Sequence, residues 1–171
     1  MEKLGIGIVI REMQSTDNEK VAMLIRKVLV ELGVPKVGTA YADTSLDQLF
    51  QNYQQPKAAF FVVEEQERIV GCAGIAQLEN YKGNVCELQK MYFLEEARER
   101  GLGAKLIHIC HTCALDFGYE YIYLETLPYM KAAQKLYLKT DFKYLQEPMG
   151  DTGHYSCSVW MLKSIRSLVT D

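Results

Sequence analysis

A turn that contains two glycines and two arginines joins a strand-like segment to the start of a helix. It runs from Gln89 to Ala104, and Arg98, Gly101 and Gly103 fit the pattern Arg-x-x-Gly-x-Gly. Glycines let the backbone approach a ligand closely, and the free amides at a helix N-terminus attract anions. The pattern therefore predicts amides that bind a pyrophosphate, and hence a nucleotide-derived cofactor. Taken alone, it is equally consistent with a plain tight turn.

Two other phosphate-binding patterns do not fit this turn. A P-loop ends in Gly-Lys-Ser/Thr, whereas Gly103 is followed by Ala104 and Lys105. A dinucleotide-binding turn needs a third small residue where Leu106 stands, and it needs a succession of parallel strands. The turn therefore belongs to neither class.

Hydrophobic periodicity places this turn within the element order βα, α, βββ, α, β, α, ββ. Asp17 is expected to be the N-cap of the first helix. The expected strands are 5–13, 58–63, 69–75, 85–93, 121–126, 142–145 and 156–162; the expected helices are 17–32, 45–55, 102–117 and 128–140, with a loop at 34–44. A meander followed by one strand-helix-strand crossover implies a mixed, mostly antiparallel sheet with helices packed on it.

The composition describes one ordinary globular domain over residues 1–171. Of the 171 residues, 49% are hydrophobic and 24% charged, and the net charge of −3 gives no attraction to nucleic acid or anionic membrane. The five cysteines, an odd number without framework spacing, fit a reducing compartment. No signal peptide or membrane-length apolar run is evident. We therefore expect a cytoplasmic protein without nucleic-acid or membrane partners.

The glycine turn resembles motif A of the GNAT acyl-CoA-dependent N-acetyltransferases, whose loop amides and helix N-terminus bind the coenzyme A pyrophosphate. Residues 133–142 look like the family's Ala-x-x-Leu-Tyr-x-Lys-x-Gly-Phe signature, and residues 124–133 are similar to a version common in bacterial small-molecule members. Two positions depart from the pattern. Asp141 replaces the usual glycine but tolerates a left-handed backbone, and Met130 replaces a frequent asparagine, which puts one side-chain contact to the cofactor in doubt.

The resemblance extends from residue 5 to residue 162 and implies a fold. That fold is an α+β protein, an α/β/α sandwich, with a mixed, mostly antiparallel sheet of about seven strands. A V-shaped split separates the fourth and fifth strands. The resemblance also makes a homodimer a family-level expectation.

The resemblance assigns catalytic roles to Glu87 and Tyr137. Glu87 corresponds to the glutamate that acts as the base, usually through water, and Tyr137 to the tyrosine that protonates the coenzyme A sulfur. A carboxylate in an apolar strand is costly unless it is paired or lines a cleft. The alternatives are a surface charge on an edge strand for Glu87 and a packed ring with a bonded hydroxyl for Tyr137.

The cofactor site is expected to depend mainly on backbone. In the resemblance, the strand that ends at residues 91–93 binds the pantetheine arm and polarises the thioester carbonyl. Arginine side chains of the turn would add charge to the phosphates, but neighbouring glutamates nearly cancel it, so the amides must dominate. The expected cofactor-binding residues are Met91, Tyr92, Phe93, Arg98, Glu99, Arg100, Gly101, Leu102, Gly103 and Ala104.

Three residues are weaker candidates for acceptor binding. Tyr41 lies in the long loop between the first two helices, and Asp151 and His154 lie in the loop before the last strand, a region that often shapes the acceptor site in this superfamily. The alternative for Asp151 is a residue that caps a hairpin turn.

Histidines and cysteines of the segment 108–113 suggest zinc, but helical geometry argues against it. At about 100° per residue, Cys110 and Cys113 lie on the core face, whereas His108 and His111 point away. We therefore expect no metal.

Together these features predict an enzyme that uses acetyl-CoA as acyl donor. It would transfer the acetyl group to a primary amine of a small molecule by direct attack in a ternary complex. Two alternatives stay open: a non-catalytic acyl-CoA-binding or sensor domain, and an acetyltransferase that acts on protein lysine or N-terminal amines.

Overall fold

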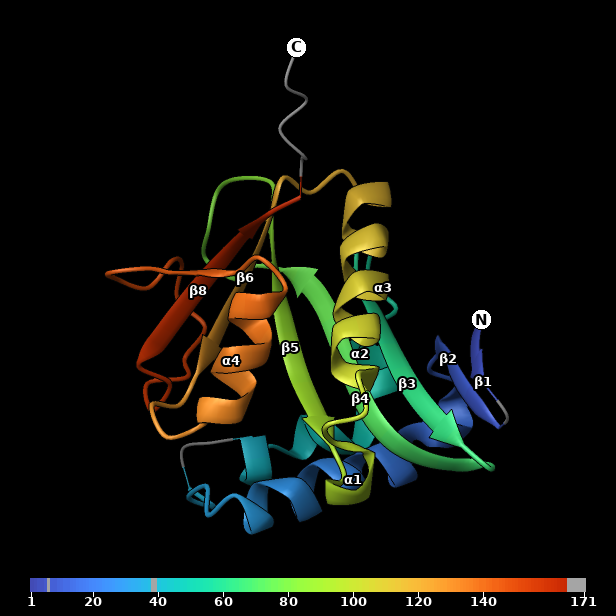
Figure 1. The fold of residues 1–171 in the computed structure, drawn as a ribbon. Helices are drawn as coiled ribbons and strands as arrows, with labels where there is room; N and C mark the ends of the chain where they lie inside the picture. Colours follow the sequence, from blue (N-terminus) through green and yellow to red (C-terminus); the bar gives the residue numbers. More distant parts are fainter. Residues whose placement is uncertain (6, 38–39, 166–171) are drawn as a thin grey trace.

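The computed structural model describes residues 1–5, 7–37 and 40–165, and in these it forms one eight-stranded sheet in the order β1-β2-β3-β4-β5-β6-β8-β7 (Figure 1). The strands are β1 (Glu2–Gly5), β2 (Ile8–Glu12), β3 (Ala59–Glu65), β4 (Arg68–Gln77), β5 (Val85–Phe93), β6 (Tyr121–Thr126), β7 (Lys143–Tyr144) and β8 (Val159–Ser164). The seven expected strands are present, and β1 adds an eighth at one edge. Residue 6 of the expected first strand lies outside the described residues.

One parallel pair interrupts an otherwise antiparallel sheet. β5 pairs with β6 only from Val85↔Tyr121 to Glu87↔Tyr123, whereas β5 continues to Phe93. Beyond Glu87 the two strands therefore part, which opens a V between the fourth and fifth expected strands. The mixed sheet and its split are confirmed.

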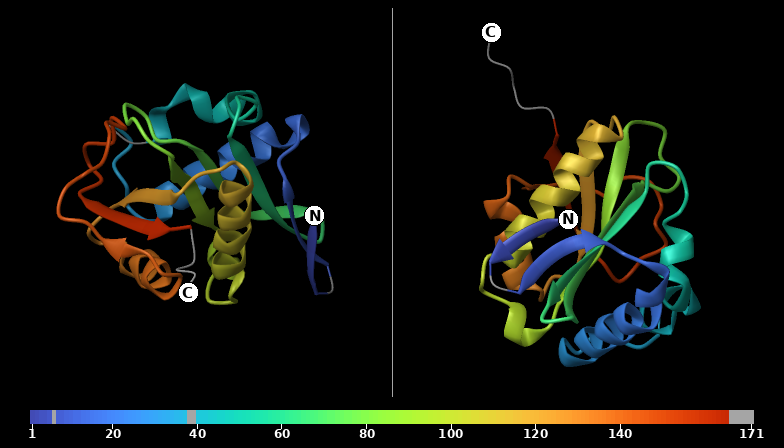
Figure 2. Two further views of the ribbon diagram at one scale, coloured as in Figure 1. Left: turned by 90° about the horizontal axis from the view of Figure 1, so that it is seen from above. Right: turned by 90° about the vertical axis from the view of Figure 1, so that its right-hand side faces the viewer.

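Helices cover both faces of the sheet. α1 (Asn18–Glu31) and α2 (Leu49–Asn52) lie on one face, and α3 (Leu102–Asp116) and α4 (Lys131–Lys139) lie on the other (Figure 2). The α/β/α sandwich is thus confirmed. No helix within the described residues has the length and apolar character needed to cross a membrane.

The expected second helix is shorter than its pattern suggested. Residues Thr44–Gln48 form a 3₁₀ helix, and only Leu49–Asn52 are α-helical. The Asp43 carboxylate accepts the Ser45 amide at 2.8 Å, which caps the tighter 3₁₀ turn instead of an α-helix. Residues 38 and 39 of the expected loop lie outside the described residues.

The middle of the sheet is buried on both sides, because α1 and α3 both contact β4. Eight consecutive residues of β4, Ile69 to Ala76, are buried. Two of them are glycines against which aromatic rings lie. A Cβ at Gly71 would overlap the Phe93 ring, and one at Gly74 would come within 2.7 Å of the Tyr53 ring. Gly74 therefore makes room for Tyr53 on the sheet.

Arg11 and Asp17 join β2 to the start of α1. Asp17 occupies the expected N-cap position, but its side chain makes no capping bond to α1. It accepts hydrogen bonds from Arg11 at 2.8 and 3.1 Å and from the Gln14 amide at 2.8 Å. Burial opposes ionisation of this carboxyl, but these bonds and the charge of Arg11 outweigh it, so the pKa of Asp17 lies below its usual range.

Arg11→Met is expected to destabilise the protein by about 2–4 kcal/mol at pH 7, because it leaves a buried carboxylate without its cation. Urea unfolding measures this loss. A lowered pKa stabilises the fold above the ordinary value near 4, so the loss should shrink as the pH falls below about 4. Arg68→Met, which breaks the exposed pair with Glu96, is the control and should cost less than about 1 kcal/mol. Equal losses in both variants would contradict the assigned role of Arg11.

Candidate active site

Glu87 lies where β5 and β6 part. Its side chain is directed to the same face as Tyr123, its last partner across the parallel pair, and the residue is only 3% exposed. Burial raises its pKa to about 7; a hydrogen bond from Gln89 opposes this rise, and the charge of Glu125 adds to it. The alternative of an exposed edge-strand charge is therefore wrong. A buried carboxyl that titrates near neutral pH can accept or release a proton under ordinary conditions.

A chain of hydrogen bonds orients Glu87. Gln89 Nε2 donates to Glu87 Oε2 at 2.7 Å, and the Tyr53 hydroxyl donates to Gln89 Oε1. The tyrosine fixes which end of the Gln89 amide is the acceptor and thereby directs the amide nitrogen toward Glu87. Gly74 of β4 supports this arrangement. It pairs with Gln89 on the neighbouring strand β5 and leaves room for the Tyr53 ring.

A bulge redirects the second half of β5. Gly74 pairs with Gln89, whereas Cys72 pairs with Tyr92, so β5 holds one more residue than β4 between these pairs. Lys90 takes the extra position with φ of 52°, and its carbonyl accepts a hydrogen bond from the Cys72 thiol at 3.4 Å. Within the described residues β5 has no strand partner on its β6 side after Glu87. Alternate amides of residues 88–93 are thus free to bind a ligand.

The loop after β5 leads into α3 through two left-handed residues. Glu99 has φ of 57° and Gly101, the N-cap of α3, has φ of 76°, and no side chain caps the helix. The first hydrogen bond of α3 joins the Lys105 amide to the Gly101 carbonyl. The amides of residues 102–104 therefore have no acceptor within the helix. Unpaired amides at the positive end of a helix dipole are suited to an anion, and binding of a phosphate here stays a prediction.

Close packing holds that end of α3 against the neighbouring elements. A Cβ on Gly103 would meet Leu136 Cδ2 at 2.7 Å and Met91 Cε at 3.4 Å. A side chain at this position would force the end of Leu136 to move, so glycine favours the close approach of α3 to α4 and to the second half of β5. Glycine suits position 103 because it has no side chain, since the backbone there does not have a positive φ.

Tyr137 lies on α4 and packs against an aromatic neighbour. The residue is 8% exposed, and its ring packs edge-on against Phe142 with centroids 5.8 Å apart. Its hydroxyl makes no hydrogen bond to another described residue. The hydroxyl oxygen is nevertheless not a buried polar atom without a partner, so it is not fully closed off from solvent. Burial raises the pKa of Tyr137 to about 12, so the phenol stays protonated at neutral pH and can donate a proton.

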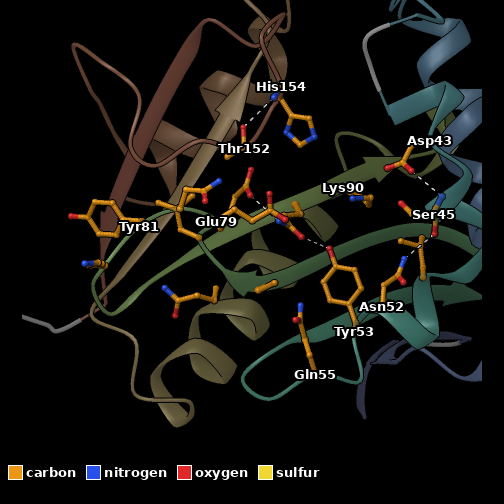
Figure 3. Close-up of a pocket in the computed structure, with 18 residues that line it drawn as sticks. Asp43, Ser45, Asn52, Tyr53, Gln55, Glu79, Tyr81, Lys90, Thr152 and His154 are labelled. Carbon is orange, nitrogen blue, oxygen red and sulfur yellow. Dashed lines mark hydrogen bonds between the residues drawn. The ribbon is translucent and has the colours of Figure 1, made fainter.

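A cleft of about 940 Å³ opens beside Glu87. Tyr53 and Asn52 form one wall, and Thr152 and His154 lie across from them (Figure 3). Carboxamide side chains are frequent in the lining, which includes Asn52, Gln55, Gln77, Asn80 and Gln89. The cleft thus offers a polar chamber whose floor carries the buried carboxyl.

Comparison with known proteins places this architecture in a family. The sequence profile described as "Acetyltransferase (GNAT) family" matches residues 27–142, which is more than half of the chain. The chain belongs to the GNAT acetyltransferase family. It is also 40% identical over 158 residues to the "Uncharacterized N-acetyltransferase YjgM" of Escherichia coli K12, a match that covers 92% of this chain and 95% of that protein. The protein is accordingly an acyltransferase.

Solved structures show the same fold. A GNAT-family acetyltransferase from Staphylococcus aureus has a TM-score of 0.79 at 20% identity and covers 93% of this chain and 99% of its own. The PaiA N-acetyltransferase of Thermoplasma acidophilum, in complex with coenzyme A, has a TM-score of 0.74 at 16% identity and covers 92% and 98% of the two chains. The GNAT fold expected from the motifs is confirmed.

Both arginines of the glycine turn in this GNAT protein have carboxylate partners. Arg98 donates to the Phe93 carbonyl at 2.9 Å and reaches Glu31 at 3.3 Å. Arg100 forms a two-pronged pair with Glu65, with bonds of 2.7 and 3.1 Å. Their contact with phosphate stays a prediction. In the structure Arg98 holds the end of β5 through its bond to the Phe93 carbonyl.

The three weaker candidates for acceptor binding lie in different surroundings. Of these described residues only His154 lines the cleft. The Asp151 carboxylate accepts the Gly153 amide at 3.2 Å, as in the hairpin-turn alternative. The Tyr41 carbonyl accepts from Arg26 at 3.4 Å, and its ring lies 5.1 Å from the Lys36 ammonium. Acceptor binding by Tyr41 and Asp151 stays a prediction.

Of the histidines and cysteines of α3, Cys110 and His108 lie as helical geometry predicts, whereas His111 and Cys113 are both half-buried. Cys110 is buried in the core, whereas His108 is exposed. The described residues whose potential ligand atoms do converge are elsewhere: Glu87, Glu125 and His154, within 4.8 Å of one another. Hydroxyl groups of Tyr123 and Thr152 donate to the two Glu125 oxygens, and Gln89 donates to Glu87. This is a hydrogen-bonded cluster beside the cleft.

Sequence reasoning missed several of these residues. It assigned Tyr53 to an apolar helix face and gave no role to Gln89, Glu125 or Thr152. Gln89 stands two residues after Glu87, and this period-2 spacing on a strand was the one available signal. The others come from distant segments and become visible only once the sheet brings them together.

Proposed function

We propose that this GNAT protein transfers the acetyl group of acetyl-CoA to the primary amine of a small polar molecule bound in the Glu87 cleft. The observation that carries the proposal is the position of Glu87: a buried carboxyl with a pKa of about 7, at the point where β5 and β6 part and at the floor of the cleft. Glu87 acts as the base and takes a proton from the acceptor ammonium, directly or through water.

The cofactor enters by the split between the strands. The uncapped amides of residues 102–104 bind the pyrophosphate, and the free amides of residues 91–93 bind the pantetheine arm and the thioester carbonyl. The coenzyme A complex of the Thermoplasma acidophilum relative supports this cofactor. The amine then attacks the carbonyl carbon, the carbon–sulfur bond breaks, and the Tyr137 phenol protonates the departing thiolate. No acetyl-enzyme forms.

The size and chemistry of the cleft support a small polar acceptor. A volume of about 940 Å³ is that of a pocket that encloses a small molecule. Its carboxamides donate and accept hydrogen bonds, which suits an amine that also carries hydroxyl or amide groups. Solved relatives include a 6'-acetyltransferase for aminoglycosides, which are amines of this kind, at 20% identity. Homodimerisation and a cytoplasmic location stay predictions.

Gly103→Ala is expected to weaken coenzyme A binding about tenfold, because the added Cβ pushes the amides of α3 away from Met91 and Leu136. Isothermal titration with coenzyme A measures the dissociation constant. Leu136→Val removes the contacted Cδ2 carbon and should restore most of the affinity in the double variant. Unchanged affinity in Gly103→Ala would show that this end of α3 does not bind the cofactor.

Thiol release from acetyl-CoA over a panel of hydroxylated amines, diamines, amino sugars and peptides tests the proposal as a whole. We expect release with at least one small amine, together with an acetylated product in the mass spectrum. A folded protein that binds coenzyme A but acetylates no amine would favour the sensor alternative. Release with peptides alone would favour a protein substrate.

A further inference from the structure

Glu125 is a second carboxylate at the split, in addition to Glu87, and its side chain is buried. It lies on β6, two residues beyond Tyr123 and thus on the same face as Glu87. Its side chain is 6% exposed. One oxygen each of Glu87 and Glu125 and one ring nitrogen of His154 lie within 4.8 Å of one another. The two strands therefore hold two carboxyl groups across the V.

Hydrogen bonds make the two carboxyl groups unequal. The Tyr123 hydroxyl donates to Glu125 Oε2 at 2.7 Å, and the Thr152 hydroxyl donates to Glu125 Oε1. Both Glu125 oxygens thus have a hydroxyl donor. Glu87 receives one amide donor, from Gln89. A proton that the pair takes up is therefore better accommodated on Glu87, where fewer donors occupy the carboxyl oxygens.

His154 connects this pair to solvent. Its Nδ1 lies 3.9 Å from Glu125 Oε1, and 43% of its side chain is exposed. The separation is suited to one bridging water or a small rotation of the ring. An imidazole has two ring nitrogens that can accept and donate a proton, which suits it to pass one between the buried carboxyl groups and solvent. The cluster thus extends from the floor of the cleft to its rim.

We propose that Glu87 and Glu125 form a coupled pair that shares the proton taken from the acceptor, and that His154 carries this proton to solvent. The inference rests on the proposed function, in which Glu87 receives a proton from the acceptor. The acceptor R–NH₃⁺ has two N–H protons to lose when R–NH–acetyl forms. One reaches the coenzyme A sulfur from Tyr137, which regains a proton from the reacting nitrogen. The other proton is taken by Glu87, is shared with Glu125, and leaves through His154.

Several other charged or titratable groups lie near Glu87 and interact with it. Lys90 on β5 favours its ionised form, whereas Glu79 in the loop after β4 disfavours it. The remaining neighbours that sense its charge are Tyr53, Tyr123, Cys86 and Cys157. Among the acidic neighbours Glu125 exerts the larger effect on Glu87. A change at Glu125 should therefore be visible in the titration of Glu87.

Carbon-13 NMR titration of the glutamate carboxyl groups tests the pair without any acceptor. In Glu125→Gln, the Glu87 step is expected to move down by roughly one to two pH units, because a like charge is removed. Thr152→Val offers a milder change if that variant does not fold: loss of the hydroxyl donor shifts the proton toward Glu125. Glu147→Gln, in the same loop but exposed, is the control. If the titration step of Glu87 stays unchanged in Glu125→Gln, the two carboxyl groups do not share a proton. Where Glu125→Gln does not fold, an unchanged step in Thr152→Val leads to the same conclusion.

Buffer rescue tests the outlet. His154→Gln is expected to lower kcat about tenfold at low buffer concentration, and added imidazole should restore it, which a purely structural loss would not allow. His108→Gln, exposed on α3, is the control. Loss of kcat without rescue, or no loss, would overturn the role of His154. If the wild-type protein acetylates no amine, the proposed function fails, while the NMR titration still decides whether the pair shares a proton.

Discussion

Glu87→Gln is expected to lower kcat/KM by about a hundredfold to ten-thousandfold, the range of a positioned general base. Glutamine keeps the size of the side chain and can still accept the Gln89 hydrogen bond, but it cannot take a proton. In the wild-type protein activity should rise with pH through about 7, because the base works only when ionised. This limb should disappear in the variant. Steady-state rates between pH 5 and 9 measure both effects.

The same substitution should stabilise the fold above neutral pH. Burial raises the pKa of Glu87, so the folded state loses stability as the pH rises from the ordinary value near 4.5 to about 7. A neutral glutamine avoids this loss, which amounts to about 3 kcal/mol at pH 8. Urea unfolding at pH 5 and pH 8 measures the difference. A variant that is both less active and less stable at pH 8 would indicate a structural role for Glu87.

Tyr137→Phe is expected to reduce kcat about a hundredfold while coenzyme A affinity and stability change little. The phenol packs against Phe142, and its hydroxyl bonds to no other described residue, so phenylalanine preserves the packing. What it removes is the proton for the thiolate. Because burial raises the pKa of Tyr137 to about 12, its ionisation should not limit the wild-type rate below about pH 11.

Tyr144→Phe is the matched control for this substitution. Its hydroxyl donates to Gln134 Oε1 at 2.9 Å. Turnover should stay within about twofold of wild type, since loss of one half-exposed hydrogen bond costs only about 1 kcal/mol of stability. If both tyrosine variants keep full activity, water or another group protonates the thiolate.

The sequence was sufficient to predict most of the elements, but not β1 or the short extent of α2. Apolar runs and glycine signals predicted the strands, and Asp141 adopts the left-handed backbone expected where glycine is usual, with φ of 71°. For Glu87 the apolar strand left two positions open, a cleft and an exposed edge, and only the fold shows that the residue is buried. The strands and the backbone at Asp141 depend on local sequence, which is why one chain was enough to predict them.

Features that depend on distant partners could not be predicted. Arg98 and Arg100 fit a phosphate-binding turn, but Glu31 and Glu65, 67 and 35 residues away, pair with them in the fold. Glu125 is an unremarkable residue at the end of a strand until the split places it beside Glu87. The pairing of charges and the coupling of two carboxyl groups are tertiary properties, and a single sequence carries no direct signal for them.

Transfer of a labelled acetyl group from acetyl-CoA tests the central claim most directly. Wild-type protein and Glu87→Gln would be incubated with carbon-13 acetyl-CoA and an amine selected from the panel, and mass spectrometry would follow both the amine and the protein. We predict a labelled amide product that forms rapidly only with the wild-type protein, while neither protein carries label. Label on the protein itself, or equal amide formation by both proteins, would contradict direct attack assisted by Glu87.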